Sequence, residues 1–301
     1  MGMCPTFRLS PSWAVLLWYL LRVKTQLDNP LLGPDGELRV GGMALENGLL
    51  LHSPRYWAAA IREEDGEVTV ASGAKSVLGA AGRSRLPLVR GVLRLADALA
   101  LLPTVKAKLG RAVLPVEAPR MMLAVAAAAM LTLGVRREKG SVLGQELGAA
   151  ALALAPAMIA LKDSRLAAYH GAEHKSIGEY ERLLRGEDPS EATKEHERCG
   201  SNLVGPMLAA NLVGNVVVRS LRRRPSPGAT LAAGLVSLGS AMELFRWMSK
   251  HPESKFAQAL SLPGDLMQRF ITTGEPDGDQ MNVAHAALAE LLRLEGVSLP
   301  T

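Results

Sequence analysis

The chain is poor in cysteine, histidine and aromatic residues. Its 301 residues include two cysteines, Cys4 and Cys199, six histidines, and only 4% Phe, Trp and Tyr. Two cysteines so far apart in the sequence do not indicate a disulfide framework, and this favours a reducing compartment. Because histidine is scarce, several histidines within a short stretch are a feature that a core helix does not require.

Long apolar runs are also missing, since none reaches the ~20 residues that a membrane-spanning helix needs. Four slightly shorter stretches, rich in alanine and glycine, are present at residues 121–135, 147–161, 203–218 and 229–245. Each could be a buried core helix on its own. Four together favour closely packed membrane helices, which use small residues at their contacts.

The charge balance is modestly basic. A formal net charge of +5 and a pI near 9.4 suit an anionic membrane surface or a nucleic acid, and the balance alone decides neither. Because the apolar stretches favour a membrane, we expect a lipid bilayer as partner and no specific nucleic acid binding.

The predicted fold class is mainly α: a polytopic membrane helix bundle of about four transmembrane helices, with a small N-terminal β unit and cytoplasmic helical segments. EEDG at residues 63–66 is a turn signal between two strand-like runs, so a hairpin is expected there. The apolar run at residues 13–21 is too short to span a bilayer, and is either an interfacial helix or one packed on its own domain. The expected parts are an N-terminal extension with this short helix (1–36), the β unit (37–75), an amphipathic helical segment (76–120), the membrane bundle containing the 162–202 segment (121–250), and a tail with an amphipathic helix (251–301).

The stretch YHGAEHKSIGEYE, residues 169–181, holds two histidines and several glutamates. His170 and His174 are four residues apart, so they lie on one face of a helix. Glu173 stands beside them, and Glu181 returns to that face two turns later. The order H-x-x-E-H is that of inverzincins, in which both histidines bind zinc and the glutamate is the general base. The five-residue pattern also arises by chance, and the alternative is that His170 and His174 are simply hydrogen-bonded polar groups at a membrane boundary.

A second group of ligand side chains follows in the motif HERCGSN. His196 and Cys199 are three residues apart, and imidazole and thiolate are both good zinc ligands. The sequence therefore predicts zinc or another divalent metal bound by His170, His174, His196 and Cys199, with Glu173 as the catalytic residue. A polar cluster without metal is the alternative.

Other ionisable residues extend the candidate site. Glu243 lies near the end of an apolar stretch, where an ionisable group is costly, so we expect a functional or paired role with Arg246 as the local partner. In the tail motif TTGEPDGDQ, Asp277 is expected to cap the following helix. Glu275 could instead reach the metal site as a carboxylate.

The motifs GGMALENGLLLHSP, RLPLVRG, YHGAEHKSIGEYE, HERCGSN and TTGEPDGDQ occur in the order seen in the YqhQ-like family of bacterial membrane proteins, domain of unknown function 1385. The chain resembles this family over residues 40–290, and YHGAEHK followed by H-x-R-C-G is the most specific part. The resemblance implies several transmembrane helices and an unproved label of metal-dependent enzyme, and it supplies no established activity.

The chain departs from the family pattern in its first and last motifs. The family usually has glutamine at the position of Met43, glutamate at Asn47 and arginine at His52, and a basic residue at Gly274. If the family's glutamate is catalytic, then Asn47 implies an impaired or altered function. The His-Glu-His and His/Cys elements are intact.

Three functions are compatible with these features. The first is a metal-dependent hydrolase acting at the membrane on a lipid-like or membrane-peptide substrate. The second is a membrane scaffold or binding protein with a structural metal or a polar network. The third, less favoured, is a transporter. A structural zinc site has four protein ligands, whereas a catalytic one leaves a position open. The expected location is the bacterial cytoplasmic (inner) membrane, multi-pass, with residues 162–202 on the cytoplasmic side. The sequence leaves the oligomeric state open.

Overall fold

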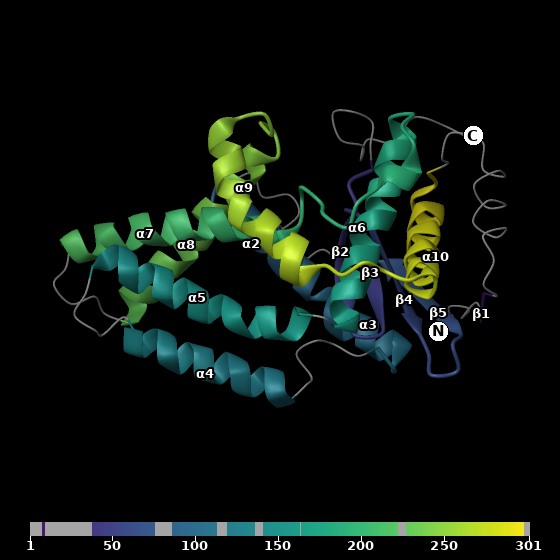
Figure 1. The fold of residues 1–301 in the computed structure, drawn as a ribbon, viewed down its shortest axis with the longest axis horizontal. Helices are drawn as coiled ribbons and strands as arrows, with labels where there is room; N and C mark the ends of the chain where they lie inside the picture. Colours follow the sequence, from purple (N-terminus) through teal and green to yellow (C-terminus); the bar gives the residue numbers. More distant parts are fainter. Residues whose placement is uncertain are drawn as a thin grey trace.

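The structure, a computed structural model, describes residues 8–9, 38–75, 86–112, 119–135, 141–162, 164–221 and 227–297. Within this part, an antiparallel sheet with its covering helices lies at one end and a group of long helices at the other (Figure 1). The apolar run at residues 13–21 lies outside the described residues.

The sheet has five strands in the order β1-β5-β4-β3-β2. Its strands are β1 (Arg8–Leu9), β2 (Gly41–Leu45), β3 (Gly48–His52), β4 (Tyr56–Arg62) and β5 (Val68–Ala74). The four longer strands form a meander, so each pairs with its neighbour in the sequence. The predicted β unit and its hairpin at residues 63–66 are present. Of the strand-like run 37–40, residue 37 lies outside the described residues, and residues 38–40 contribute only a single bridge at Leu38.

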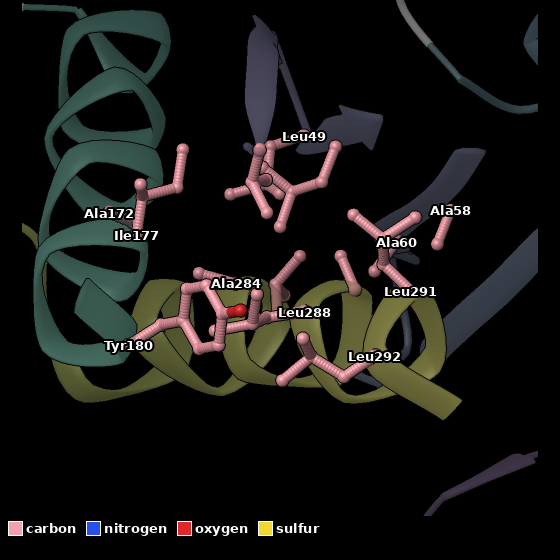
Figure 2. Close-up of a cluster of buried hydrophobic side chains, with 14 of the residues drawn as sticks. Leu49, Ala58, Ala60, Ala172, Ile177, Tyr180, Ala284, Leu288, Leu291 and Leu292 are labelled. Atoms are coloured by element: carbon pink, nitrogen blue, oxygen red, sulfur yellow. The ribbon is translucent and has the colours of Figure 1, made fainter. Parts of the chain in front are cut away.

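Both faces of the sheet are buried. Side chains along a strand alternate between its two sides, so neighbouring residues pack into different clusters. Leu49 and Leu51 point to one face, against helices α6 (Arg165–Leu184) and α10 (Gly278–Glu295). Figure 2 shows this cluster, with Tyr180 of α6 and Leu288 of α10 packed below the strands. Leu50 points the opposite way, into a second cluster with helix α3 (Leu101–Leu109). Two-sided burial explains why the central parts of β3 and β4 are continuously apolar.

The remaining helices are α2 (Val89–Leu99), α4 (Pro119–Val135), α5 (Val142–Leu161), α7 (Val204–Leu221), α8 (Pro227–Met248) and α9 (Lys255–Met267). The four apolar stretches of the sequence are therefore helical, in α4, α5, α7 and α8. The π-helix Gln268–Thr272 (η5) continues α9, and the 3-10 helix Gly200–Leu203 (η4) precedes α7. Large apolar side chains such as Leu123, Met130 and Ile159 are exposed on the long helices.

The prediction of a polytopic membrane bundle is wrong for the residues that the structure describes, because no helix among them is both long and apolar enough to cross a membrane. α4 has 17 residues and would reach about 26 Å, less than the ~30 Å hydrocarbon core. The longer helices carry polar side chains such as Gln145, Ser237 and Glu243. The prediction of a multi-pass protein of the bacterial cytoplasmic membrane, with residues 162–202 facing the cytoplasm, is wrong for the same reason.

Candidate metal centre

Helix α6 carries most of the candidate site. It begins after Ser164, whose Oγ accepts a hydrogen bond of 3.1 Å from the backbone N–H of Ala167, a standard N-cap. One face of α6 packs on the sheet through Ala172 and Ile177. Glu173 and His174 are also buried, so the packed part of this helix holds ionisable groups away from water.

His170, His174 and Cys199 form a compact group. One nitrogen of each imidazole and the Cys199 Sγ atom all lie within 4.8 Å of one another. The distance from Cys199 Sγ to His170 Nε2 is 3.4 Å. Since Zn–N bonds are about 2.0–2.1 Å and Zn–S bonds about 2.3 Å, such atoms need only small movements to share one ion.

Backbone carbonyls fix the orientation of both imidazoles. Nδ1 of His170 lies 2.7 Å from the carbonyl oxygen of Thr272, and Nδ1 of His174 lies 2.6 Å from that of Lys194. A carbonyl can only accept a hydrogen bond, so each Nδ1 carries a proton. The lone pair is then on Nε2, the arrangement that orients histidine ligands in metalloproteins. Burial also lowers the pKa of His174, which favours its neutral form.

The segment before α7 brings Cys199 to the histidines. Cys199 precedes η4, and its Sγ atom accepts hydrogen bonds from the N–H and the Oγ of Ser201, at 3.5 and 3.2 Å. The Asn202 side chain closes the turn by donating to the carbonyl of Glu197 at 3.0 Å. The thiol is therefore held by local contacts and is nearly buried, at 7% exposure.

Glu173 is buried beside this group, at 6% exposure. Among the described residues, no hydrogen bond or ion pair involves its carboxyl group. The carboxyl lies against Gly42 of β2, where an added Cβ would come within 2.6 Å of Glu173 Oε1. Burial raises the pKa of Glu173 to about 7, although the charges of His170 and His196 act in the opposite direction. The side chain is therefore able to hold or release a proton near neutral pH.

His196 is not part of the three-ligand group. Its ring centroid lies 5.6 Å from that of His174, but both of its nitrogens face other partners. Nε2 lies 3.4 Å from Glu181 Oε2, and Nδ1 accepts the backbone N–H of Arg198 at 3.2 Å. Glu181 also pairs with the Arg198 guanidinium. Glu181 thus anchors the HERCGSN segment and does not face the three potential ligands.

Two other predicted residues have partners outside the group. Glu243 binds Arg90 of α2, at 2.7 Å from Nε; the expected partner Arg246 contributes only the smaller effect of its charge, which with Arg90 lowers the pKa of the Glu243 carboxyl. This contact was hidden from the sequence because the two residues are 153 positions apart. Glu275 pairs with Lys175, and its side chain is 65% exposed.

Asp277 and Asn47 have structural contacts. Asp277 caps α10, as expected, in a reciprocal capping box with Gln280. Asn47 lies in the turn between β2 and β3, and its Nδ2 donates to the carbonyl of Arg111 at 3.1 Å. Neither is brought into the ligand group.

Sequence reasoning missed three residues that support the three potential ligands. The backbone carbonyls of Thr272 and Lys194 bind the two imidazoles, and the Gln268 side chain binds the backbone N–H of His196. A carbonyl is present at every position, so no residue type marks Thr272 or Lys194 as a partner. Gln268 has no sequence signal either, because only the structure shows that this uncharged polar residue is fully buried.

Comparison with known proteins matches the part of the chain that contains the candidate residues. Residues 155–294 match the model of a family described as protein of unknown function, DUF1385. The uncharacterized protein YqhQ of Bacillus subtilis (strain 168) is 34% identical over 139 residues, which are 44% of this chain and 42% of that protein. The chain thus matches less than half the length of this relative. No solved structure matches. The family match includes His170, His174 and Cys199 and excludes the sheet, so it is shorter than the resemblance over residues 40–290.

Proposed function

The chain belongs to the DUF1385 family through residues 155–294, and we propose that His170, His174 and Cys199 bind a divalent metal ion, zinc in the first instance, for hydrolysis. The observation that carries this proposal is the convergence of three ligand atoms within 4.8 Å. Two imidazoles and one thiolate are a ligand set suited to zinc. The carbonyl partners of both Nδ1 atoms support the same assignment.

The number of available ligands favours a catalytic over a structural site. A structural zinc ion has four protein ligands, and His196 is the natural candidate for the fourth. Its two nitrogens are instead engaged with Glu181 and the Arg198 backbone. Three ligands leave one coordination position open, which is the arrangement of catalytic zinc.

Glu173 supplies the proton-transfer group in this proposal. When bound, the ion would lower the pKa of a water molecule in its open position. Glu173 immediately precedes the ligand His174 on α6, its carboxyl is buried against Gly42 of β2, and no hydrogen bond or ion pair involves that carboxyl within the described part of the chain. A general base needs such a carboxyl, because a carboxylate already bound to arginine or lysine is a weaker proton acceptor.

The test is a titration of purified, metal-free chain with Co²⁺, together with elemental analysis of the protein as isolated. We expect one ion per chain and a thiolate-to-cobalt charge-transfer absorption, because Cys199 would be a ligand. Cys199→Ser should remove this absorption, and His170→Ala or His174→Ala should abolish tight binding. His196→Gln is the control and should keep it. Two results would contradict the proposal: Co²⁺ binding that is lost only in His196→Gln, or Co²⁺ binding that is unchanged in all four variants.

A second candidate is a cysteine nucleophile, favoured by one specific contact. Cys199 Sγ lies 3.4 Å from His170 Nε2, and His170 is oriented in turn by Thr272. This sequence of nucleophile, base and orienting group is that of cysteine hydrolases. Rapid alkylation of Cys199 by iodoacetamide, unaffected by Co²⁺ or Zn²⁺, would favour it. Protection of Cys199 by either ion would favour the metal site.

A further inference from the structure

The π-helix η5 contacts every segment that contributes a potential metal ligand. π-Helical turns are rare and occur frequently at functional sites. Here the turn follows α9, which packs against η4 and α7. Three sets of hydrogen bonds lead from η5 and the residue after it to His170, to His174 and to the Cys199 segment.

The first connection is the Thr272 carbonyl, which accepts the Nδ1 proton of His170 at 2.7 Å. A carbonyl at the end of a helix lacks an intrahelical partner. In a π-helix this carbonyl would accept the N–H five residues further on, but the chain leaves the helix after Thr272, because Thr273 is extended. The Thr272 carbonyl oxygen is therefore free to orient a histidine.

The second connection is the Gln268 side chain, which is fully buried. Its Oε1 accepts the backbone N–H of His196 at 2.8 Å, and its Nε2 donates to Asn202 Oδ1 at 3.2 Å. These two hydrogen bonds hold the HERCGSN segment in place at one residue before and one residue after Cys199. The Gln268 carbonyl meanwhile accepts the N–H and the hydroxyl of Thr273, at 3.3 and 2.7 Å, which closes the π turn.

The third connection is Lys194. Its Nζ atom donates to the carbonyls of Arg269 and Thr273, each at 3.2 Å. Its own carbonyl accepts the Nδ1 proton of His174 at 2.6 Å. Lys194 therefore links the second histidine to the same turn.

We propose that η5 is the frame that sets the spacing of the three metal ligands, and that Gln268 is its central positioning residue. The inference rests on the proposed function, because it concerns the geometry of that metal site. Within the described residues, the Gln268 side chain makes no hydrogen bond to the three ligand side chains; it acts through the backbone N–H of His196 and the side chain of Asn202. A buried glutamine with both of its polar ends bonded holds that segment in one position, and movement of the segment would move Cys199 relative to His170.

The test compares Co²⁺ affinity and the thiolate-to-cobalt absorption among variants of the full chain. Gln268→Met keeps the size of the side chain and removes both hydrogen bonds. Gln280→Met is the matched control, since Gln280 is a buried glutamine whose Oε1 accepts the N–H of Asp277 in the capping box of α10. We expect Gln268→Met to weaken Co²⁺ binding about 10–100-fold, the usual effect of removing outer-shell support. Gln280→Met should bind Co²⁺ like wild type.

Lys194→Met is the second variant, because its partly exposed side chain can be replaced with less risk to folding. It should weaken binding about tenfold, at the low end of the same range. Three results would overturn the inference while leaving the metal site intact. The first is wild-type Co²⁺ affinity in folded Gln268→Met, and the second is equal weakening in the Gln280→Met control. The third applies if Gln268→Met does not fold, and is wild-type Co²⁺ affinity in Lys194→Met. A wild-type chain that binds no Co²⁺ would overturn both.

Discussion

Gly171 of α6 lies directly beneath the carbonyl oxygen of Gly274, so closely that a Cβ on Gly171 would overlap that oxygen. The Gly274 N–H also donates to the carbonyl of Ala167 at 2.8 Å. The segment after η5 therefore crosses α6 at a residue without a side chain. His170 immediately precedes this crossing, and its Thr272 partner lies two residues before Gly274.

Gly171→Ala should destabilise the fold. The added methyl group would meet a backbone oxygen, which cannot rotate away as a flexible side chain could. We expect the free energy of unfolding to fall by about 3 kcal/mol, the upper part of the usual range for overpacking. Urea unfolding measures this value. Gly278→Ala is the control, because nothing lies within 4 Å of its Cβ position, and it should be neutral or slightly stabilising. Equal losses in both variants would contradict the close crossing.

This crossing illustrates why part of the site could not be predicted. The i, i+4 spacing of His170 and His174 places them on one helix face wherever that helix lies, so the sequence suffices for that relationship. The contact between Gly171 and Gly274 joins residues about a hundred positions apart, and nothing in either motif refers to the other. Long-range contacts between backbone atoms depend on how whole elements pack.

The apolar stretches show a different limit. Their composition predicted helices correctly, in α4, α5, α7 and α8. Composition did not decide what surrounds those helices, because short alanine-rich and glycine-rich helices suit a membrane and a protein interior alike. Glu243 shows this directly: it looked costly in a presumed membrane span, yet it binds Arg90 across a helix–helix contact.

Asp277→Ala should reduce stability without affecting metal binding. Asp277 Oδ1 accepts the N–H of Gln280 at 2.8 Å, and loss of an N-cap costs about 1 kcal/mol. Thermal unfolding of the metal-free chain measures the change, and Asp279→Ala serves as comparison because Asp279 pairs with Arg62 at the surface. A Co²⁺ affinity lowered by Asp277→Ala would show that α10 contributes to the site, against this prediction.

His52→Gln should make the protein less sensitive to acid. Burial and the neighbouring Lys75 ammonium lower the pKa of His52 from 6.5 to about 4 in the folded chain. The unfolded chain binds this proton at higher pH, so stability is complete above pH 6.5 and is lost as the pH falls toward 4. The corresponding free energy is about 3 kcal/mol, reduced to about 2 kcal/mol by partial exposure of the side chain. Unfolding free energies measured between pH 7 and 4 should fall less in His52→Gln, and identical slopes would refute this assignment.

Glu173→Gln should separate catalysis from metal binding. Glutamine keeps the size of the side chain, and the carboxyl it replaces is not among the three ligands. Co²⁺ affinity should therefore stay within about threefold of wild type. Function in a cell-based complementation assay should be lost, because the general base is gone. Replacing a buried carboxyl that lacks a partner within the described residues should also raise the free energy of unfolding at pH 8 by about 1 kcal/mol, because the cost of burying its charge disappears. His174→Ala is the comparison and should lose Co²⁺ binding and complementation together. If Glu173→Gln complements fully while His174→Ala does not, the site is a structural one and Glu173 has no catalytic role. If both variants complement and keep their Co²⁺ affinity, the YHGAEHK helix owes its histidines to hydrogen bonding alone.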